Sequence, residues 1–94
     1  MSAERIPVAV RLGRIVATPN ALQSIPNEEI LKAIQRHQAG DWGSLDSEDR
    51  NSNDRALVSG GRIFSAYQAP DGTKFWIITE ADRSVTTVLL PEDY

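Results

Sequence analysis

The stretch RIFSAYQ-APDGT-KFWIIT-EADR-SVTTVLL, residues 62–90, decides the fold. Three runs rich in β-branched and aromatic residues are separated by turn signals, as in a chain of β-hairpins. Pro70-Asp71-Gly72 favours a type I turn followed by a glycine with positive φ, and residues 80–83 close the second hairpin. The sequence therefore predicts a three-stranded antiparallel meander with strands at 62–68, 74–79 and 84–90.

Alternation along these strands divides their side chains between two faces, provided that Gln68 opposes Lys74 and Thr79 opposes Ser84. One face then carries Phe64, Ala66, Trp76, Ile78, Val85, Thr87 and Leu89; the other carries Ile63, Ser65, Tyr67, Phe75, Ile77, Thr86 and Val88. We expect the face with Trp76 to meet the helices. The second face is too apolar to be wholly wet, so we expect the N-terminal strand, residues 91–94 or a second subunit to cover part of it.

The first half of the chain predicts one strand and two or three short helices. Residues 1–7 read as a flexible arm, and residues 8–17 as a strand with a bend at Gly13. Thr18 and Pro19 can start a short helical turn. The whole chain is therefore predicted to be a single α+β domain over residues 1–94.

The clearest predicted helix follows Pro26, with Asn27 as its cap and Gly40 after its last turn. Its apolar face is expected to hold Ile30, Leu31, Ile34 and His37. Asp46, followed by Asp49, resembles the cap of another helix that ends before Gly60-Gly61. The middle of this second helix is so polar that one side must be solvated or contact something polar.

Composition excludes several classes of protein. The 94 residues include no cysteine, so neither a disulfide framework nor a thiolate metal site can form, and we expect no metal and no cofactor. The net charge of −3 and the scattered basic residues argue against general nucleic-acid binding. No apolar run is long enough for a membrane span and no signal peptide is recognisable, which predicts a cytoplasmic protein.

His37, the single histidine, is the first candidate for chemistry. It is expected to be a half-buried residue near a helix C-terminus, where its cation would be favoured. The alternative is a general base oriented by Asp41 or Asp46, with Tyr67 and Arg83 completing a catalytic set. No phosphate-binding loop and no glycine-framed nucleophile accompany it.

Residues that could contact a partner come from a glycine-framed turn, from the sheet and from the second hairpin. Trp42, within Gly40-Asp41-Trp42-Gly43, is either a core plug, which we favour, or a stacking platform. The 79–84 turn concentrates ionisable groups, which can form a site or simply a solvated turn. The interaction candidates are Trp42, Tyr67, Phe75, Glu80, Asp82 and Arg83.

Three segments carry a resemblance to a known family. Gly40-Asp41-Trp42-Gly43, Ser65-Ala66-Tyr67 and the run from Trp76 to Tyr94 are similar to a family of short bacterial proteins labelled hypothetical or plasmid-related, some with labels connecting them to restriction systems. The resemblance covers roughly residues 12–94. It implies a bacterial cytoplasm and links to mobile DNA, and it implies no mechanism.

Three functions follow as hypotheses. The leading one is a non-enzymatic interaction or regulatory module that binds a protein, or another copy of itself, through a sheet face or edge. The second is a small RNase-like enzyme or toxin that uses His37. The third is a nucleic-acid-binding or anti-restriction factor, although mimicry of DNA would need a denser array of carboxylates than this chain has.

Overall fold

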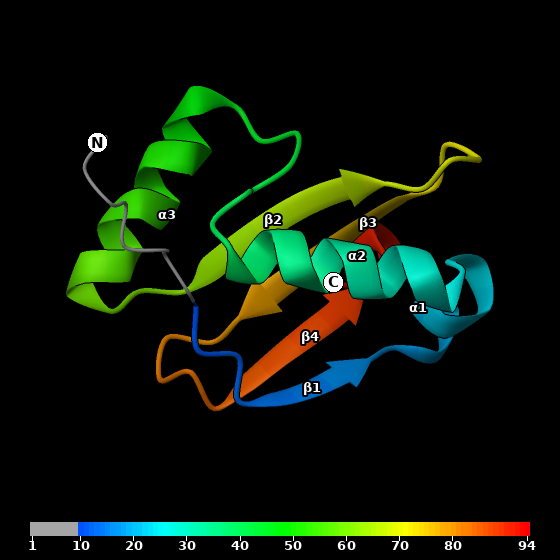
Figure 1. Cartoon of the computed structure of the whole chain (residues 1–94), viewed down its shortest axis with the longest axis horizontal. Coiled ribbons are helices and arrows are strands. Elements are labelled where there is room, and N and C mark those ends of the chain that lie inside the picture. The colour runs from blue at the N-terminus through cyan, green and yellow to red at the C-terminus, as the bar shows by residue number, and fades with distance from the viewer. Residues whose placement is uncertain (1–9) are drawn as a thin grey trace, which may run out of the picture.

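A computed structural model describes residues 10–94 and shows helices packed on a four-stranded sheet (Figure 1). Residues 1–7, expected to form an arm, and the first part of the expected strand lie outside the described residues. In chain order the elements are β1 (Arg14–Ala17), α1 (Pro19–Ser24), α2 (Asn27–Gln38), α3 (Ser47–Ser59), β2 (Ile63–Gln68), β3 (Lys74–Thr79), β4 (Val85–Leu89) and the 3-10 helix η1 (Pro91–Asp93).

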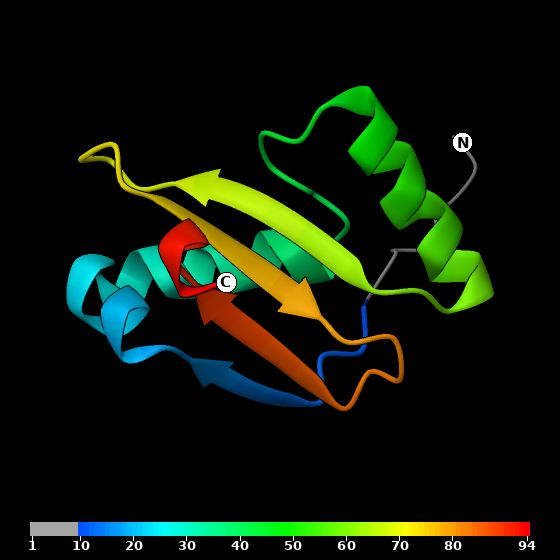
Figure 2. The same ribbon diagram turned by 180° about the vertical axis from the view of Figure 1, so that it is seen from behind.

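The sheet contains the predicted meander and one strand more. Its order is β1-β4-β3-β2, and β1 runs parallel to β4 while the other neighbours are antiparallel (Figures 1 and 2). The α+β class and the meander are confirmed, but the sheet is mixed. Strand β1 begins only at Arg14, because Gly13 just before it has φ +61° and turns the chain, as the predicted bend required.

The strand register agrees with the prediction in the first hairpin and differs in the second. Gln68 pairs with Lys74 as expected, whereas Thr79 pairs with Thr86 and not with Ser84. The second turn is longer than expected because Arg83 adopts φ +62° and its amide bonds back to the Glu80 carbonyl. A shift of two residues keeps every side chain on its predicted face.

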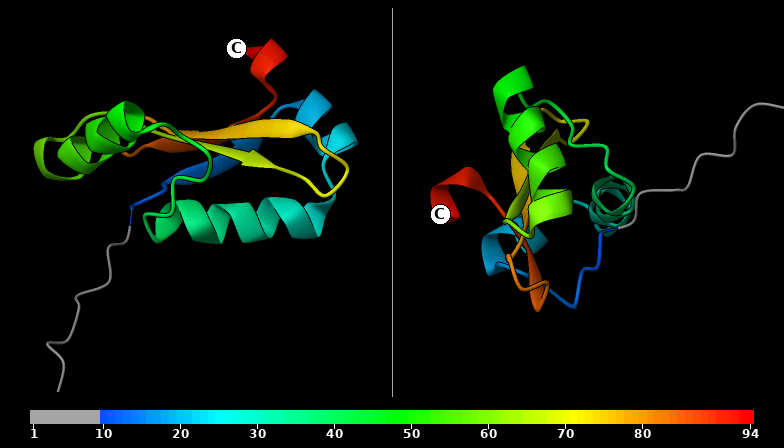
Figure 3. Two further views of the ribbon diagram at one scale, coloured as in Figure 1. Left: turned by 90° about the horizontal axis from the view of Figure 1, so that it is seen from above. Right: turned by 90° about the vertical axis from the view of Figure 1, so that its left-hand side faces the viewer.

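The two predicted face sets are right, but the expectation of which set meets the helices is wrong. Helix α2 lies on the side that carries Phe75 and Ile77, and η1 lies on the opposite side (Figure 3). The buried members of this helix-covered face are Ile63, Ser65, Tyr67, Phe75, Ile77, Thr79, Thr86 and Val88. Phe64, Ala66 and Trp76 instead lie half-buried on what we call the open face.

Helix α2 buries a narrower stripe than its sequence predicts. Ile30, Ala33 and His37 are buried, while Leu31 is 61% exposed and Ile34 is half-buried. Positions 30, 33 and 37 follow the i, i+3, i+7 spacing of one helix face, and Leu31 falls outside it. The stripe packs with Ile25, Phe75 and Val88 into the main hydrophobic core.

Two of the three predicted helix caps are present. Thr18 Oγ1 accepts a hydrogen bond from the Ala21 amide at 3.1 Å, and Asp46 Oδ1 accepts one from the Asp49 amide at 2.9 Å. Asn27 does not cap α2; it is the first helical residue, after Pro26, and no side chain caps this end. The acidic Glu28 and Glu29 in the first turn favour the positive end of the helix dipole.

The outer edge of β2 is closed by α3 and by the loop that precedes it. Asn53 is buried, donates to the Phe64 carbonyl at 2.6 Å and accepts from the Phe64 amide at 3.1 Å. One turn of the loop adds two more bonds, from the Ala66 amide to the Trp42 carbonyl and from the Ser44 amide to the Ala66 carbonyl. The polar middle of α3 thus contacts polar backbone, as one of the two sequence readings required.

Candidate functional site

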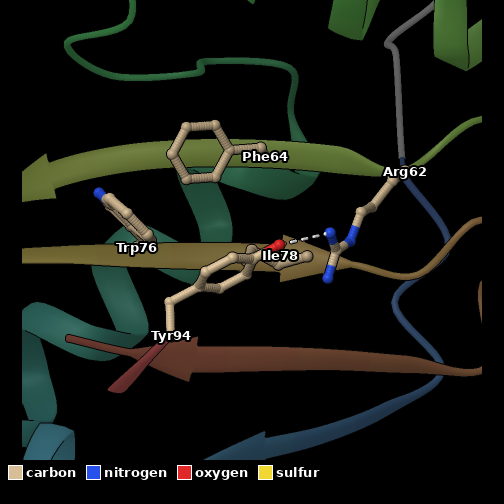
Figure 4. A pocket seen from close by; sticks show the side chains of 5 residues that line it. All are labelled: Arg62, Phe64, Trp76, Ile78 and Tyr94. Atoms are coloured by element: carbon tan, nitrogen blue, oxygen red, sulfur yellow. Dashed lines mark hydrogen bonds between the residues drawn. The ribbon is translucent and has the colours of Figure 1, made fainter. Parts of the chain in front are cut away.

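The open face carries a hollow of about 180 Å³ lined by Arg62, Phe64, Trp76, Ile78 and Tyr94 (Figure 4). Phe64 and Ile78 are cross-strand neighbours on β2 and β3, and Trp76 lies two residues before Ile78 on β3. The rings of Phe64 and Trp76 meet edge to face, with centroids 5.1 Å apart. We call these five residues the aromatic hollow.

Tyr94 and Arg62 form the rim of the aromatic hollow. The Tyr94 ring meets Trp76 edge to face at 5.8 Å between centroids and is 70% exposed. Arg62 Nη1 donates to the Tyr94 hydroxyl at 2.9 Å, and Nε lies 3.6 Å from a Glu80 carboxylate oxygen. These contacts raise the Arg62 pKa, first through the Tyr94 hydrogen bond, so a permanent cation lies beside an apolar floor.

The 3-10 helix η1 places Tyr94 over the sheet. Its Asp93 accepts hydrogen bonds from Thr18 Oγ1 at 2.6 Å, from Asn20 Nδ2 at 2.7 Å and from the Leu90 amide at 3.0 Å. These bonds, led by the one from Thr18, lower the Asp93 pKa. The start of α1 therefore anchors the segment that forms one wall of the aromatic hollow.

His37 lies on the other side of the sheet, in the core. Its side chain is fully buried, with Nδ1 2.6 Å from Ser65 Oγ and Nε2 2.8 Å from Thr79 Oγ1. Thr79 Oγ1 is 2.7 Å from Thr86 Oγ1, which donates to the Leu12 carbonyl at 2.8 Å. Every polar atom in this chain of hydrogen bonds has a partner.

The carbonyl at one end fixes the direction of the hydrogen bonds as far as His37 Nε2, and for a neutral imidazole the bond to Ser65 follows. The Leu12 carbonyl only accepts, so Thr86 donates to it, Thr79 donates to Thr86, and Thr79 must accept from His37 Nε2. The imidazole is thereby assigned as the Nε2–H tautomer, and Ser65 donates to Nδ1. A second proton, on Nδ1, would require the Ser65 hydroxyl to turn round and accept instead of donating.

Burial, and after it the charge of Arg83, lower the His37 pKa to about 4. The expectation of a half-buried, cation-favouring histidine is therefore wrong, because the ring enters the core instead of remaining at the helix end. The ring of Trp42 closes the site edge-on at 5.9 Å. A neutral imidazole with no exposed atom has no route to a substrate in this conformation.

The other proposed catalytic residues do not join His37. Asp41 is held by Arg36 Nε at 2.7 Å, which lowers its pKa, and it lies at the surface. The Tyr67 hydroxyl donates to the Asp41 carbonyl at 2.6 Å, and burial raises its pKa to about 12. The Arg36 guanidinium lies 4.8 Å from the Tyr67 ring centroid, so this group supports the 40–44 loop.

Arg83 has a structural role. Its guanidinium donates to the carbonyls of Gly61, Glu80, Ala81 and Ala56 at 2.6–3.2 Å. These bonds join the second hairpin to the end of α3. Asp82 accepts from the Ser84 amide and hydroxyl, which matches the solvated-turn reading of residues 79–84.

Three of the predicted interaction residues are buried in this structure and offer almost no surface to a partner. Trp42, Tyr67 and Phe75 are 6%, 4% and 2% exposed; for Tyr67 and Phe75 the reason is that the helices cover the face opposite to the one expected. Trp42 is the predicted core plug, and its Nε1 donates to Asp54. Glu80 and Asp82 are accessible and Arg83 is half-buried; only Glu80 touches the aromatic hollow, through Arg62.

Sequence reasoning missed the residues of the aromatic hollow as a site. The sequence did contain a signal, because its alternation places Phe64 of β2 and Trp76 and Ile78 of β3 on the same face of the sheet. The expectation that the helices cover this face hid the possibility of a surface site there. Tyr94 had no strand or helix pattern to place it.

Within residues 10–94, no group of histidine and carboxylate side chains could hold a metal ion. No helix in the same range has the length and hydropathy to cross a bilayer. Comparison of the chain with protein-family models, with curated proteins and with solved structures gives no match.

Proposed function

We propose that this chain is a non-enzymatic protein-interaction module whose aromatic hollow receives one apolar side chain of a partner protein. Arg62 would meet a carboxylate next to that side chain. The observation that carries the proposal is a group of three aromatic rings, in which Trp76 contacts both Phe64 and Tyr94, on the sheet face that the helices leave open. Aromatic and arginine side chains are the residues that most often dominate the energy of protein interfaces.

The size of the hollow favours a side chain over a cofactor. Its volume of about 180 Å³ is well below the ~300–1,000 Å³ of typical small-molecule sites. The floor formed by Phe64, Trp76 and Ile78 is apolar, and the polar groups of Arg62 and Tyr94 lie at the rim. This arrangement of apolar centre and polar rim is the anatomy of a protein-interface anchor pocket.

The charges around the hollow favour an acidic peptide over a nucleic acid. Arg62 is the one basic residue in the lining, and Glu80 already pairs with it. Glu92 and Asp93 belong to η1 on the same side of the sheet. A phosphate backbone would meet these carboxylates, whereas a partner with one carboxylate needs only to displace Glu80 from Arg62.

Selection from a displayed library of short random peptides tests the proposal. We expect the selected peptides to combine a large apolar residue with a neighbouring Asp or Glu. The binding site can be read by NMR, because the two tryptophans report on opposite faces. The Trp76 indole signal should move on titration with a selected peptide, while the signal of Trp42, which is buried and bonded to Asp54, should not.

Matched variants define the expected losses. Tyr94→Ala and Arg62→Glu should each weaken peptide binding about tenfold or more, the effect expected of an interface hot spot. Val58→Ala and Arg55→Glu, at exposed positions of α3, should leave binding unchanged. Selection of peptides without an acidic or apolar preference, or binding of single-stranded oligonucleotides at the same signals, would overturn the proposal.

A further inference from the structure

The two edges of the sheet are treated differently by the fold. The β2 edge is closed by Asn53 and by residues 42–44. Beyond β1, no element of the described chain lies alongside, as Figures 1 and 2 both show. An open strand edge is a template for another strand, and proteins usually block it with proline, lysine or a bulge. Strand β1 is short, with four residues and one charged side chain, Arg14, but it has no proline, lysine or bulge within Arg14–Ala17.

The alternation of the parallel ladder identifies the free backbone groups. The amides of Arg14 and Thr18 bond inward to Ser84 and Val88 of the β4 segment. The backbone groups of the intervening Ile15 and Ala17 therefore point outward. The Ile15 side chain is 48% exposed at this edge, so both backbone and apolar surface are available.

We infer that the β1 edge binds the β1 edge of a second copy of this chain, in an antiparallel pairing centred on Val16. This register sets Ile15 opposite Ala17 of the second copy, and each such pair exchanges both of its backbone hydrogen bonds. The contact is isologous, as a twofold-symmetric dimer requires.

Other registers leave outward groups without partners. If the pairing of the two β1 strands shifted by one residue, the outward backbone groups of one copy would lie opposite residues of the other copy whose amides already bond to β4. Centring the pair on Ala17 would place Ile15 opposite Pro19, which has no amide to donate. Centring it on Ile15 would oppose Ala17 to Gly13, whose φ of +61° lies outside the extended region.

Charge complementarity favours the same register and a second copy as the occupant. It places Arg14 opposite Thr18 of the second copy, and each Thr18 hydroxyl is bonded to an Asp93 carboxylate. Arg14 is exposed, and no residue of the described range forms an ion pair with it or with Asp93. Twofold symmetry would bring these opposite charges together twice.

The resulting dimer would join two four-stranded sheets into one. A twofold axis normal to the sheet keeps both open faces on the same side. The assembly would thus present two aromatic hollows to one partner surface, which can strengthen binding without any new contact. The dimer itself does not depend on the hollow being a binding site.

A single cysteine tests the register directly, since the chain has none of its own. Val16→Cys would face its own copy as a non-hydrogen-bonded pair, at about 4.5 Å between Cα atoms, within the range that a disulfide spans. Oxidation should therefore give a covalent dimer of Val16→Cys at low protein concentration. Arg14→Cys, whose opposite residue is Thr18, should give several-fold less.

Sedimentation of the cysteine-free chain over a concentration series tests the association itself. We expect a reversible monomer–dimer equilibrium, weakened about tenfold or more in Ile15→Pro, which removes an outward amide and leaves the bonds to β4 intact. Arg14→Glu should weaken it less, and Arg11→Glu should not change it. Circular dichroism and the two indole signals verify that each variant is folded.

The outcomes separate this inference from the proposed function. Tyr94→Ala should dimerise normally, and Ile15→Pro should still bind the selected peptides. A wild-type chain that stays monomeric at all concentrations, or a dimer that Tyr94→Ala breaks and Ile15→Pro does not, would overturn the inference. Equal disulfide yields from Val16→Cys and Arg14→Cys would overturn the register.

Discussion

The two faces of the sheet are similar in apolar content and opposite in the treatment of their polar atoms. The helix-covered face includes Ser65, Thr79 and Thr86. All three are fully buried, and all belong to the series of hydrogen bonds that passes through His37. The open face has Phe64 and Trp76 on its strands and leaves them half-buried. The face whose strands carry fewer hydroxyl side chains is therefore the one that the helices leave open.

This difference shows that serine and threonine residues in a strand do not by themselves predict that their side chains are exposed to solvent. A buried hydroxyl is tolerated where a partner satisfies it, and the imidazole of His37 supplies donor and acceptor at the required places. Once these bonds form, the helix-covered face has no unsatisfied side-chain polar atom among the described residues. Aromatic rings on the open face have no such constraint and remain available.

The largest expected effect compares a phenylalanine on each face. Phe75→Ala removes a ring that is 2% exposed in the main core and should lower the free energy of unfolding by about 3–5 kcal/mol. Phe64→Ala, half-buried on the open face, should cost about 1–2 kcal/mol. Urea unfolding of both variants measures the difference. Equal losses would mean that the open face is as closely packed as the core.

Acid should act on the helix-covered face through His37. The pKa is about 4 in the folded chain and 6.5 in the unfolded one, so the unfolded state binds the proton first as pH falls. Stability should decrease from pH 6.5 to about 4 by about 3 kcal/mol, and His37 should contribute no further loss below that. Urea midpoints measured across this window test it.

His37→Gln is the control for the acid effect, because an amide can donate and accept without titrating. Its stability should be nearly constant over the upper part of that window, since the chain has no other histidine. A wild-type profile as flat as that of His37→Gln would show that the imidazole is not neutral and enclosed.

A smaller effect extends the comparison to the edges of the sheet. Asn53→Ala leaves the Phe64 amide and carbonyl without partners and should cost about 1–3 kcal/mol. Asn51→Ala, exposed on the same helix, should change stability by no more than about 0.5 kcal/mol. Thermal unfolding compares the two. Similar values would contradict closure of the β2 edge by Asn53.

Local signals in the sequence were sufficient for most of the elements. The Pro70-Asp71-Gly72 turn, the Thr18 and Asp46 caps and the alternation in the meander are each decided by a few neighbouring residues, and the structure confirms them. The two face sets survived even the wrong hairpin register, because the register shift was an even number of residues.

Long-range pairing could not be predicted, and the choice of face depended on it. The side on which the helices pack depends on how the chain returns from β1 to β2 across β4 and β3, and therefore on where β1 joins the sheet. Nothing in residues 14–17 specifies β4 as the neighbour. The signal that was available was chemical: a histidine at a buried helix position needs partners, and Ser65 and Thr79 share a face that can supply them.

The one-way order of hydrogen bonds from Ser65 to the Leu12 carbonyl makes His37 a natural reporter of opening. Its Nε2 proton is shielded from water by the core and is committed to Thr79. It should exchange with deuterium only when α2 leaves the sheet, at a rate set by the global opening of the domain. A single nitrogen resonance would thus time how often the whole fold comes apart.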